Sequence, residues 1–211
     1  MSLSRRAFIG RAAVLAAAAL APLPRAAARA GFVTAEASRD VVLDTLDGVV
    51  AYVVPGDDRF SAAQGVSSAR PGGVAARGAE GVRATLDAVG PGIGDAAVTV
   101  LNGFARAVDP AADGRAAGAG FSAPFAALSF AAKDDVFERL TQSVDETFRM
   151  LGGLLPAIAA FVSYSEYGAL APGGHALTGR PVGWELSGYE GAADGRAEFR
   201  GYYGGRRRAR A

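Results

Sequence analysis

Few residues in this chain have a type and spacing that suit chemistry. His175 is the only histidine and could act as a general base, while Asp57 and Asp58 follow Pro55–Gly56 and could form paired carboxylates or metal ligands. However, His175 lies in a glycine-rich stretch with no obvious carboxylate to orient it, and adjacent acids after Pro-Gly are more often turn-formers. We therefore expect no catalytic residue and no metal site, and rank an enzyme using these three residues last.

The sequence also predicts no cofactor on this chain. Gly118–Ala123 matches the letters of the dinucleotide fingerprint Gly-x-Gly-x-x-Ala, but a loop-like segment precedes it where the fingerprint needs a strand, and Pro124 follows at once. The only lysine, Lys133, follows alanine, which excludes a P-loop. Since the chain has no cysteine, it cannot form disulfides, iron–sulfur clusters or zinc–thiolate sites.

The distribution of charge argues against nucleic acid as a partner. The 211 residues include 22 basic and 21 acidic side chains, but residues 1–30 hold five arginines and no acid. The remaining chain therefore carries more acidic than basic residues, and it lacks the basic excess that binding of phosphates requires. Half of the residues are hydrophobic, which suffices for one globular core.

Residues 1–30 have the features of a targeting segment. Arg5 and Arg6, followed by Phe8 and Ile9, resemble the twin-arginine export signal, whose pattern is Ser/Thr-Arg-Arg-x-Phe-Leu-Lys. These four residues would engage the twin-arginine translocation machinery, which carries folded proteins. A general secretory signal with a chance arginine pair is the alternative. Either interpretation predicts an extracytoplasmic location, in the periplasm or cell envelope.

The rest of this segment fits a removable signal. The apolar run Ala12–Leu23 has twelve residues, fewer than the ~20 that a spanning helix needs. Small residues at Ala28 and Ala30 predict cleavage before Gly31, although cleavage after Ala28 is equally open.

Helical spacing of apolar residues predicts an all-α fold for residues 31–167. The first helix would begin at Thr34 and end before Pro55, and an irregular stretch would follow up to Gly73. A second helix spans residues 74–89 and a third spans residues 97–108. We expect a small helical bundle with long irregular loops.

The most regular apolar pattern lies in the second half of the chain. Ser129 can cap its start, and Gly152–Gly153 and Pro156 should break or kink it into two helices. We interpret the stripe as core. Its members alternate steps of three and four residues: Phe137, Leu140, Val144, Phe148, Leu151, Leu155, Ile158 and Val162.

Residues 168–211 form an unusual carboxy-terminal arm that ends in a basic tail. Eleven glycines between residues 168 and 205 argue against stable helix, yet the arm is rich in aromatic side chains. Such side chains must pack against a surface, either on their own bundle or on another protein. We predict that they are anchors at a partner interface: Trp184, Tyr189, Phe199, Tyr202 and Tyr203.

Several segments together resemble a known family. They are Val53–Asp58, Phe125–Ser129, Tyr164–Gly168, Gly179–Trp184, Ser187–Tyr189 and Gly201–Tyr203. In these the chain is similar to the gluconate 2-dehydrogenase subunit 3 family. Its members are small proteins with twin-arginine signals, encoded with flavin-dependent dehydrogenases of the glucose–methanol–choline type. The chain departs from the family in having no cysteine and in a Gly/Ser-rich insertion at residues 61–73.

The resemblance implies a non-catalytic accessory subunit. Such a subunit escorts the large flavoprotein subunit through twin-arginine export and covers part of its surface. FAD would reside on that partner, which passes electrons to a multihaem cytochrome in many such complexes. The alternative is an independent extracytoplasmic helical binding or structural protein without a flavoprotein partner.

Overall fold

The computed structural model describes residues 22–30, 39–171 and 176–189. All regular elements within them are helical apart from one isolated bridge between Leu170 and Leu177, which confirms the predicted all-α class. The helices are α2 (Leu23–Arg29), α3 (Arg39–Val53), α4 (Arg59–Ala63), α5 (Gly78–Val89), α6 (Ile93–Val108), α7 (Ala112–Gly118), α8 (Phe130–Thr141), α9 (Glu146–Tyr164) and α10 (Val182–Ser187), with the short 3₁₀ helices η1 (Pro124–Ala127) and η2 (Tyr167–Ala169).

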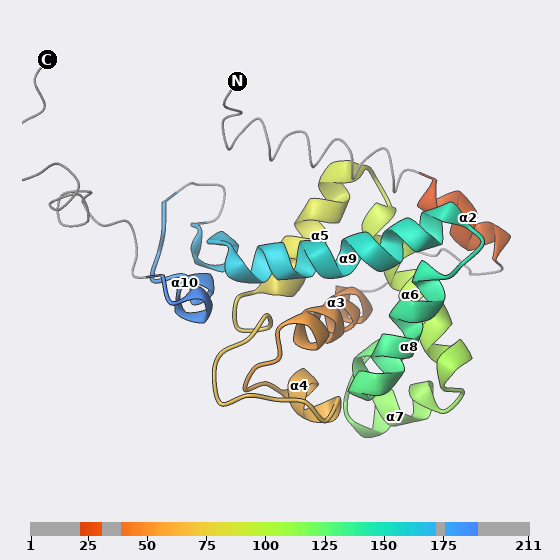
Figure 1. The fold of residues 1–211 in the computed structure, drawn as a ribbon, viewed down its shortest axis with the longest axis horizontal. Coiled ribbons are helices and arrows are strands. Elements are labelled where there is room, and N and C mark those ends of the chain that lie inside the picture. Colours follow the sequence, from red (N-terminus) through yellow and green to blue (C-terminus); the bar gives the residue numbers. More distant parts are fainter. Residues whose placement is uncertain (1–21, 31–38, 172–175, 190–211) are drawn as a thin grey trace, which may run out of the picture.

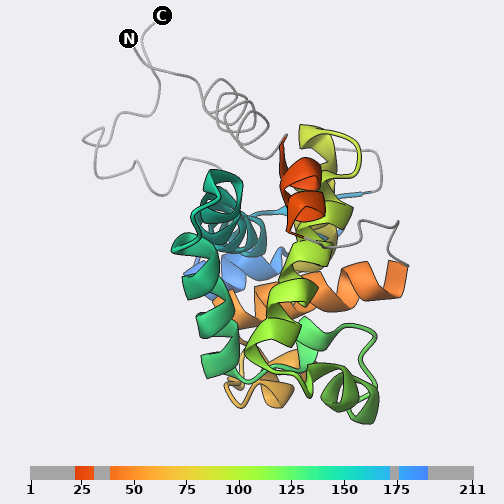
Figure 2. The same ribbon diagram turned by 90° about the vertical axis from the view of Figure 1, so that its right-hand side faces the viewer.

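The bundle is organised around α9, which lies along the long axis of the molecule (Figure 1). Helices α3, α5 and α8 pack against α9, and α6 packs in turn against α3, α5 and α8. The view turned by 90° shows α6 and α8 on either side of the interior (Figure 2). The shorter helices α4 and α7 and the turn η1 close one end of the bundle beside α3.

The core contains apolar side chains from every long helix. Phe125 in η1 is fully buried and meets Phe137 of α8 edge-to-face, with ring centroids 5.9 Å apart. Fully burying one such side chain contributes about 1.5–3 kcal/mol to the free energy of folding. Other large side chains in the core include Leu46, Leu86, Leu101, Leu128, Leu140, Leu151 and Leu155.

Among the helices whose first turn and preceding residue are described, α4, α8 and α9 begin at a side-chain cap. Ser129 caps α8 by accepting a hydrogen bond from the backbone N–H of Ala132, which confirms its predicted role. Asp145 caps α9 in the same way. Asp58 caps the short helix α4, which lies within the stretch predicted to be irregular. Asp58 therefore has a local structural role, but it caps a helix where the sequence predicted a turn residue. Thr34 lies outside the described residues.

The apolar stripe between Phe137 and Val162 is divided into two helices, as predicted, but the break does not lie at the predicted position. The chain turns at residues 142–145, where Val144 is 99% exposed and not in the core, while α9 continues through Gly152–Gly153 and Pro156. A Cβ on Gly152 would lie 2.9 Å from Cβ of Leu140, so this glycine permits close packing of α8 on α9. Burial of the continuous apolar face therefore outweighs the local preference of Gly and Pro to end a helix.

The two ends of the described chain both pack on the bundle. Helix α2 lies within the predicted export signal, yet Leu23, Ala26 and Ala27 are buried in the main core. At the other end, α10 forms inside the arm that was predicted to be too rich in glycine for helix. That prediction is wrong locally because the stretch Val182–Ser187 contains only one glycine and is bounded by Pro181 and Gly188.

Candidate interaction surface

Helix α9 presents apolar side chains on its outer face as well as on its core face. Met150 is 39% exposed, Phe161 is 61% exposed and Tyr164 is 49% exposed, while Leu154 is half-buried between them. These positions are spaced by three, four or seven residues and so lie along one side of the helix. The opposite side carries the core residues of the predicted stripe. Helix α9 is therefore apolar on two faces, and the described residues cover only one of them.

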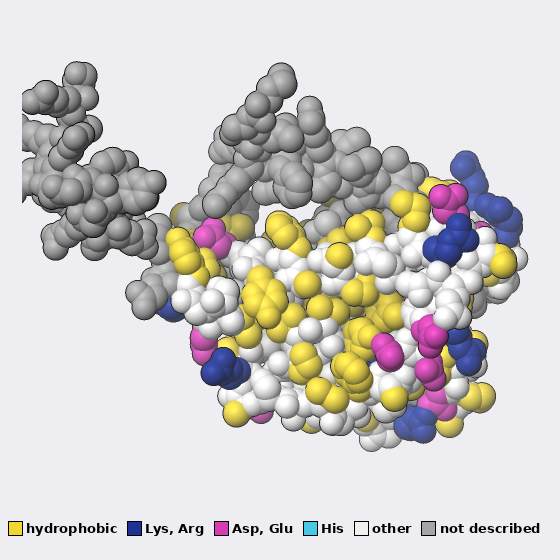
Figure 3. Space-filling view, viewed as in Figure 1, with side chains coloured by type: hydrophobic (Ala, Val, Ile, Leu, Met, Phe, Trp, Pro, Cys, Tyr) yellow, Lys and Arg dark blue, Asp and Glu magenta, His cyan; other side chains and the backbone are white. Residues whose placement is uncertain are grey.

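No acidic or basic side chain interrupts this outer face between Arg149 and Glu166. Figure 3 shows hydrophobic side chains spread over the centre of the face that α9 crosses, with charged side chains gathered toward its edges. In the described part of the chain, α9 is long and apolar enough to cross a membrane by length and composition alone. Half of that window is buried in the bundle, as expected for the central helix of a helical domain.

Helix α10 packs against the carboxyl end of α9 through a glycine. A Cβ on Gly183 would lie 2.5 Å from the carbonyl carbon of Tyr164 and 2.7 Å from the carbonyl oxygen of Ser165. Real Cβ atoms essentially never approach backbone atoms so closely, so only glycine allows this contact. Gly183 therefore fixes the position of α10, and with it Trp184, relative to α9.

Trp184 and Tyr189 form an aromatic pair at this end of α9. Their rings meet edge-to-face, with centroids 5.1 Å apart and an interplanar angle of 86°. The backbone N–H of Tyr189 donates to the carbonyl of Trp184, and Arg180 donates to the carbonyl of Tyr189. Trp184 is half-buried and Tyr189 is 46% exposed. The pair is held in place and still offers aromatic surface to solvent.

We call this region the α9–α10 surface, defined by Met150, Leu154, Phe161, Tyr164, Trp184 and Tyr189. It contains the two predicted interface residues that the structure describes. The other predicted anchors, Phe199, Tyr202 and Tyr203, lie outside the described residues, as do His175 and the export-signal residues Arg5, Arg6, Phe8 and Ile9.

The sequence prediction did not include Phe161 and Tyr164. Both residues lie beside members of the predicted core stripe but point to the other side of the helix. A signal for them was present, because the run from Met150 to Ser165 is apolar at nearly every position rather than on one face. A helix that is apolar all round needs a covering on every side.

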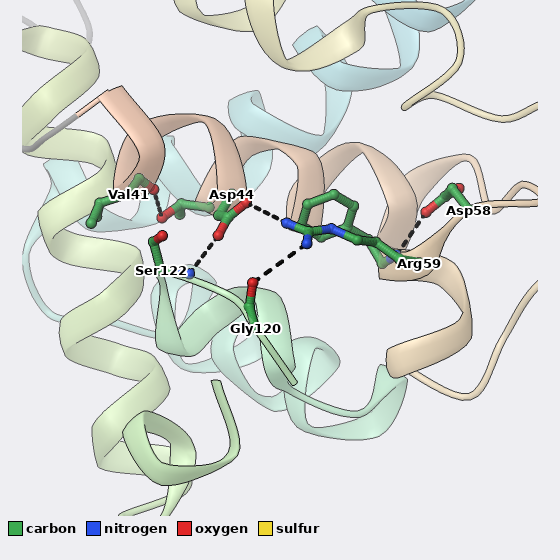
Figure 4. Close-up of polar contacts among 8 residues, drawn as sticks. Val41, Asp44, Asp58, Arg59, Gly120 and Ser122 are labelled. Atoms are coloured by element: carbon green, nitrogen blue, oxygen red, sulfur yellow. Dashed lines mark hydrogen bonds and ion pairs between the residues drawn. The ribbon is translucent and has the colours of Figure 1, made fainter. Parts of the chain in front are cut away.

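A second group of contacts joins α3 and α4 to the loop after α7. Asp44 accepts hydrogen bonds from Arg59, at 3.0 Å, and from the backbone N–H of Ser122 (Figure 4). The Arg59 guanidinium lies 4.8 Å from the ring centroid of Phe60 and 4.7 Å from that of Phe121, within the range of cation–π attraction. All these contacts are internal, so the cluster holds the end of the bundle together.

Two ionisable groups near this cluster have strongly shifted pKa values. Burial lowers the pKa of Lys133 to about 7, with the Asp58 carboxylate opposing the shift. Its Nζ donates to the carbonyl of Gly48 at 3.1 Å and to Oε1 of Gln64 at 2.9 Å. Burial, together with the nearby carboxylates of Glu80, Asp44 and Asp58, raises the pKa of Asp47 to about 7. Lys133 is fully buried, so its amine serves packing and hydrogen bonding.

The Asp58 carboxylate is also used internally, whereas Asp57 is exposed. Oδ1 of Asp58 accepts from the backbone N–H groups of Phe60 and Ser61, and its Oδ2 accepts from the Ser61 hydroxyl. Gly118–Ala123 begins at the last residue of helix α7, whereas a dinucleotide fingerprint would follow a strand. Among the described residues there is no group of three or more His, Cys, Asp or Glu side chains placed to hold a metal ion.

No protein-family model matches the chain, and neither the curated proteins nor the solved structures include a detectably similar protein.

Proposed function

We propose that this chain is the non-catalytic accessory subunit of an FAD-dependent alcohol or sugar dehydrogenase, which it escorts through twin-arginine export and then stabilises outside the cytoplasm. The flavin, and with it the catalysis, belongs to the partner subunit. A multihaem cytochrome would accept the electrons from that partner. Arg5 and Arg6, with Phe8 and Ile9, would engage the export machinery on behalf of the whole complex.

The α9–α10 surface is the observation that supports this proposal most. Phe161 is more than half exposed on α9, in which no residue after Arg149 is charged, and Trp184 and Tyr189 lie near the end of this helix. Aromatic anchors surrounded by apolar neighbours are typical of the centre of protein–protein interfaces. A partner protein that covers this surface would remove the cost of leaving it in water.

One observation favours the alternative, an independent extracytoplasmic protein. Part of the arm already packs on its own bundle, because Gly183 of α10 lies against the end of α9. That hypothesis also requires that no large apolar surface stay exposed, and the exposed stripe of α9 does not meet this requirement. The escort role therefore remains the better supported of the two.

The test is to co-express the chain with a flavin-dependent dehydrogenase of the proposed type that lacks its own export signal, and to purify any complex that forms. We expect a 1:1 complex with flavin absorbance, and we expect Phe161→Asp to weaken it by about 30-fold or more, because truncating a central aromatic anchor costs about 2 kcal/mol or more. Val144→Asp is the matched control, since Val144 is fully exposed outside α9. Equal binding by both variants would show that the partner does not use this surface.

Export is tested separately by changing Arg5 and Arg6 to lysine. If the escort role is correct, this double substitution leaves both this chain and the flavoprotein in the cytoplasm. Export of the flavoprotein at its normal level would refute the role, whatever the binding measurements show.

A further inference from the structure

Helix α2 is packed into the bundle like any other core helix. Leu23, Ala26 and Ala27 are each no more than 1% exposed, and they belong to the main hydrophobic cluster. The helix contacts both α6 and α9. Figure 2 shows it lying beside α6. Its outward positions, Arg25 and Ala28, are exposed, so α2 is amphipathic in the manner of a surface helix that covers a core.

This packing conflicts with the cleavage expected at the end of an export signal. The small residues Ala28 and Ala30 that predict cleavage lie in and directly after α2, and the backbone N–H of Ala30 donates to the carbonyl of Ala26 at 3.0 Å. A protease needs its substrate backbone extended, so α2 would have to unwind and leave the core before it could be cut.

Cleavage there would also change the bundle that remains. Loss of Leu23, Ala26 and Ala27 would expose the parts of α6 and α9 that they cover. Helix α6 is buried at three consecutive positions, Ala96 to Val98, so it needs cover on more than one side. Removal of α2 would therefore open an apolar groove in the folded protein.

We propose that Leu23–Arg29 is a permanent element of the folded protein and that the exported chain is not cut after Ala28 or Ala30. Processing, where it occurs, lies before α2. The inference rests on packing alone and holds whether or not the chain escorts a flavoprotein. It also means that the functional export signal is shorter than the segment predicted from sequence.

The first test compares two neighbouring alanines in the full chain produced in the cytoplasm. Ala27→Gln forces a polar side chain into the core, and we expect it to lower the midpoint of thermal unfolding by about 5 °C, the shift expected for a polar, overpacked core position in a chain of this size. Ala28→Gln places the same side chain on the exposed face and should leave the midpoint unchanged. Equal midpoints for the two variants would show that α2 is not packed.

The second test is the intact mass of chain recovered from the cell envelope and periplasm. We expect a mass that includes Leu23–Arg29. A chain that begins at Arg29 or Gly31 would overturn the proposal even if the Ala27 variant is destabilised. If no chain is recovered from the envelope or periplasm, the unfolding midpoints of Ala27→Gln and Ala28→Gln are the test of the proposal.

Discussion

Lys133 allows a direct measurement of what a buried cation contributes to this bundle. Its side chain is fully buried, its only described acceptors are two neutral oxygens, and burial lowers its pKa from 10.5 to about 7. In the unfolded chain the lysine keeps its ordinary pKa. Between pH 7 and pH 10.5, therefore, the unfolded state binds one proton more than the folded state does.

This difference in bound protons fixes the sign and size of the effect. Where the unfolded state binds one extra proton, the free energy of unfolding rises with pH by about 1.4 kcal/mol per pH unit. Across the window set by the two pKa values the total is about 5 kcal/mol, an upper limit because local opening admits water to the amine. Below pH 7 Lys133 is protonated in both states, so burial of its charge lowers the free energy of unfolding by the full amount. Above pH 10.5 the amine is neutral in both states and this effect is absent.

We predict that Lys133→Met removes this slope. We would measure the free energy of unfolding of the wild type and the variant in urea at pH 7.5, 8.5 and 9.5. Over these two pH units the value for the wild type should rise relative to that of the variant by up to about 2.7 kcal/mol. Other titrating groups contribute equally to both proteins and cancel in the difference. Arg139→Met is the matched control, since it removes an exposed cation from the same helix. Its stability should change with pH in parallel with the wild type.

The result that would refute the reasoning is a constant difference in unfolding free energy between wild type and Lys133→Met across this range. Such a result would mean that the buried amine stays protonated in the folded state. Because Lys133 is the only lysine, its ammonium is the only lysine signal in an NMR titration, and that titration gives the pKa independently.

Two further predictions concern other parts of the structure. Burial raises the pKa of Asp47 from 3.8 to about 7, so the free energy of unfolding falls as the pH rises between these two values. Asp47→Asn should therefore raise the free energy of unfolding by about 1–2 kcal/mol at pH 8, after allowance for the partial exposure of this residue. Below about pH 4 the substitution should have no effect. A gain that persists at pH 3.5 would contradict this explanation. Gly183→Ala should displace α10 and shift the fluorescence of the single tryptophan toward that of an exposed indole, whereas Gly179→Ala, whose Cβ meets nothing within 4 Å, should leave the spectrum unchanged. Identical spectra for the two variants would show that α10 does not depend on the close approach.

Local patterns predicted most of the helices. The predicted helices at residues 74–89 and 97–108 correspond to α5 and α6, and Ser129 begins α8 as expected. These predictions succeeded because helical spacing of apolar residues and side-chain capping depend only on neighbours in sequence. The prediction of a break at Gly152–Gly153 and Pro156 was wrong because it considered only neighbours in sequence. Packing against Leu140 and the other α8 residues keeps α9 continuous, and intrinsic helix propensity does not include such tertiary contacts.

The candidate surface was predicted only in part. Trp184 and Tyr189 were identified from composition, since aromatic side chains in a glycine-rich segment need a surface to pack on. Phe161 and Tyr164 could not be assigned in this way, because an apolar helix has several faces and sequence alone does not say how many neighbours will cover them. It is the arrangement of α3, α5 and α8 around α9 that leaves this face uncovered by the described part of the chain.

By itself, the sequence determined the helical class, the cap at Ser129, and the exclusion of any cysteine-based chemistry, because each follows from residue identity and short-range spacing. The tertiary structure alone decided that α2 is a core helix, since an Ala/Leu-rich segment serves equally well as an export signal or as a buried surface. It also decided which side of α9 faces water, because burial depends on what packs against a helix and not on the helix itself.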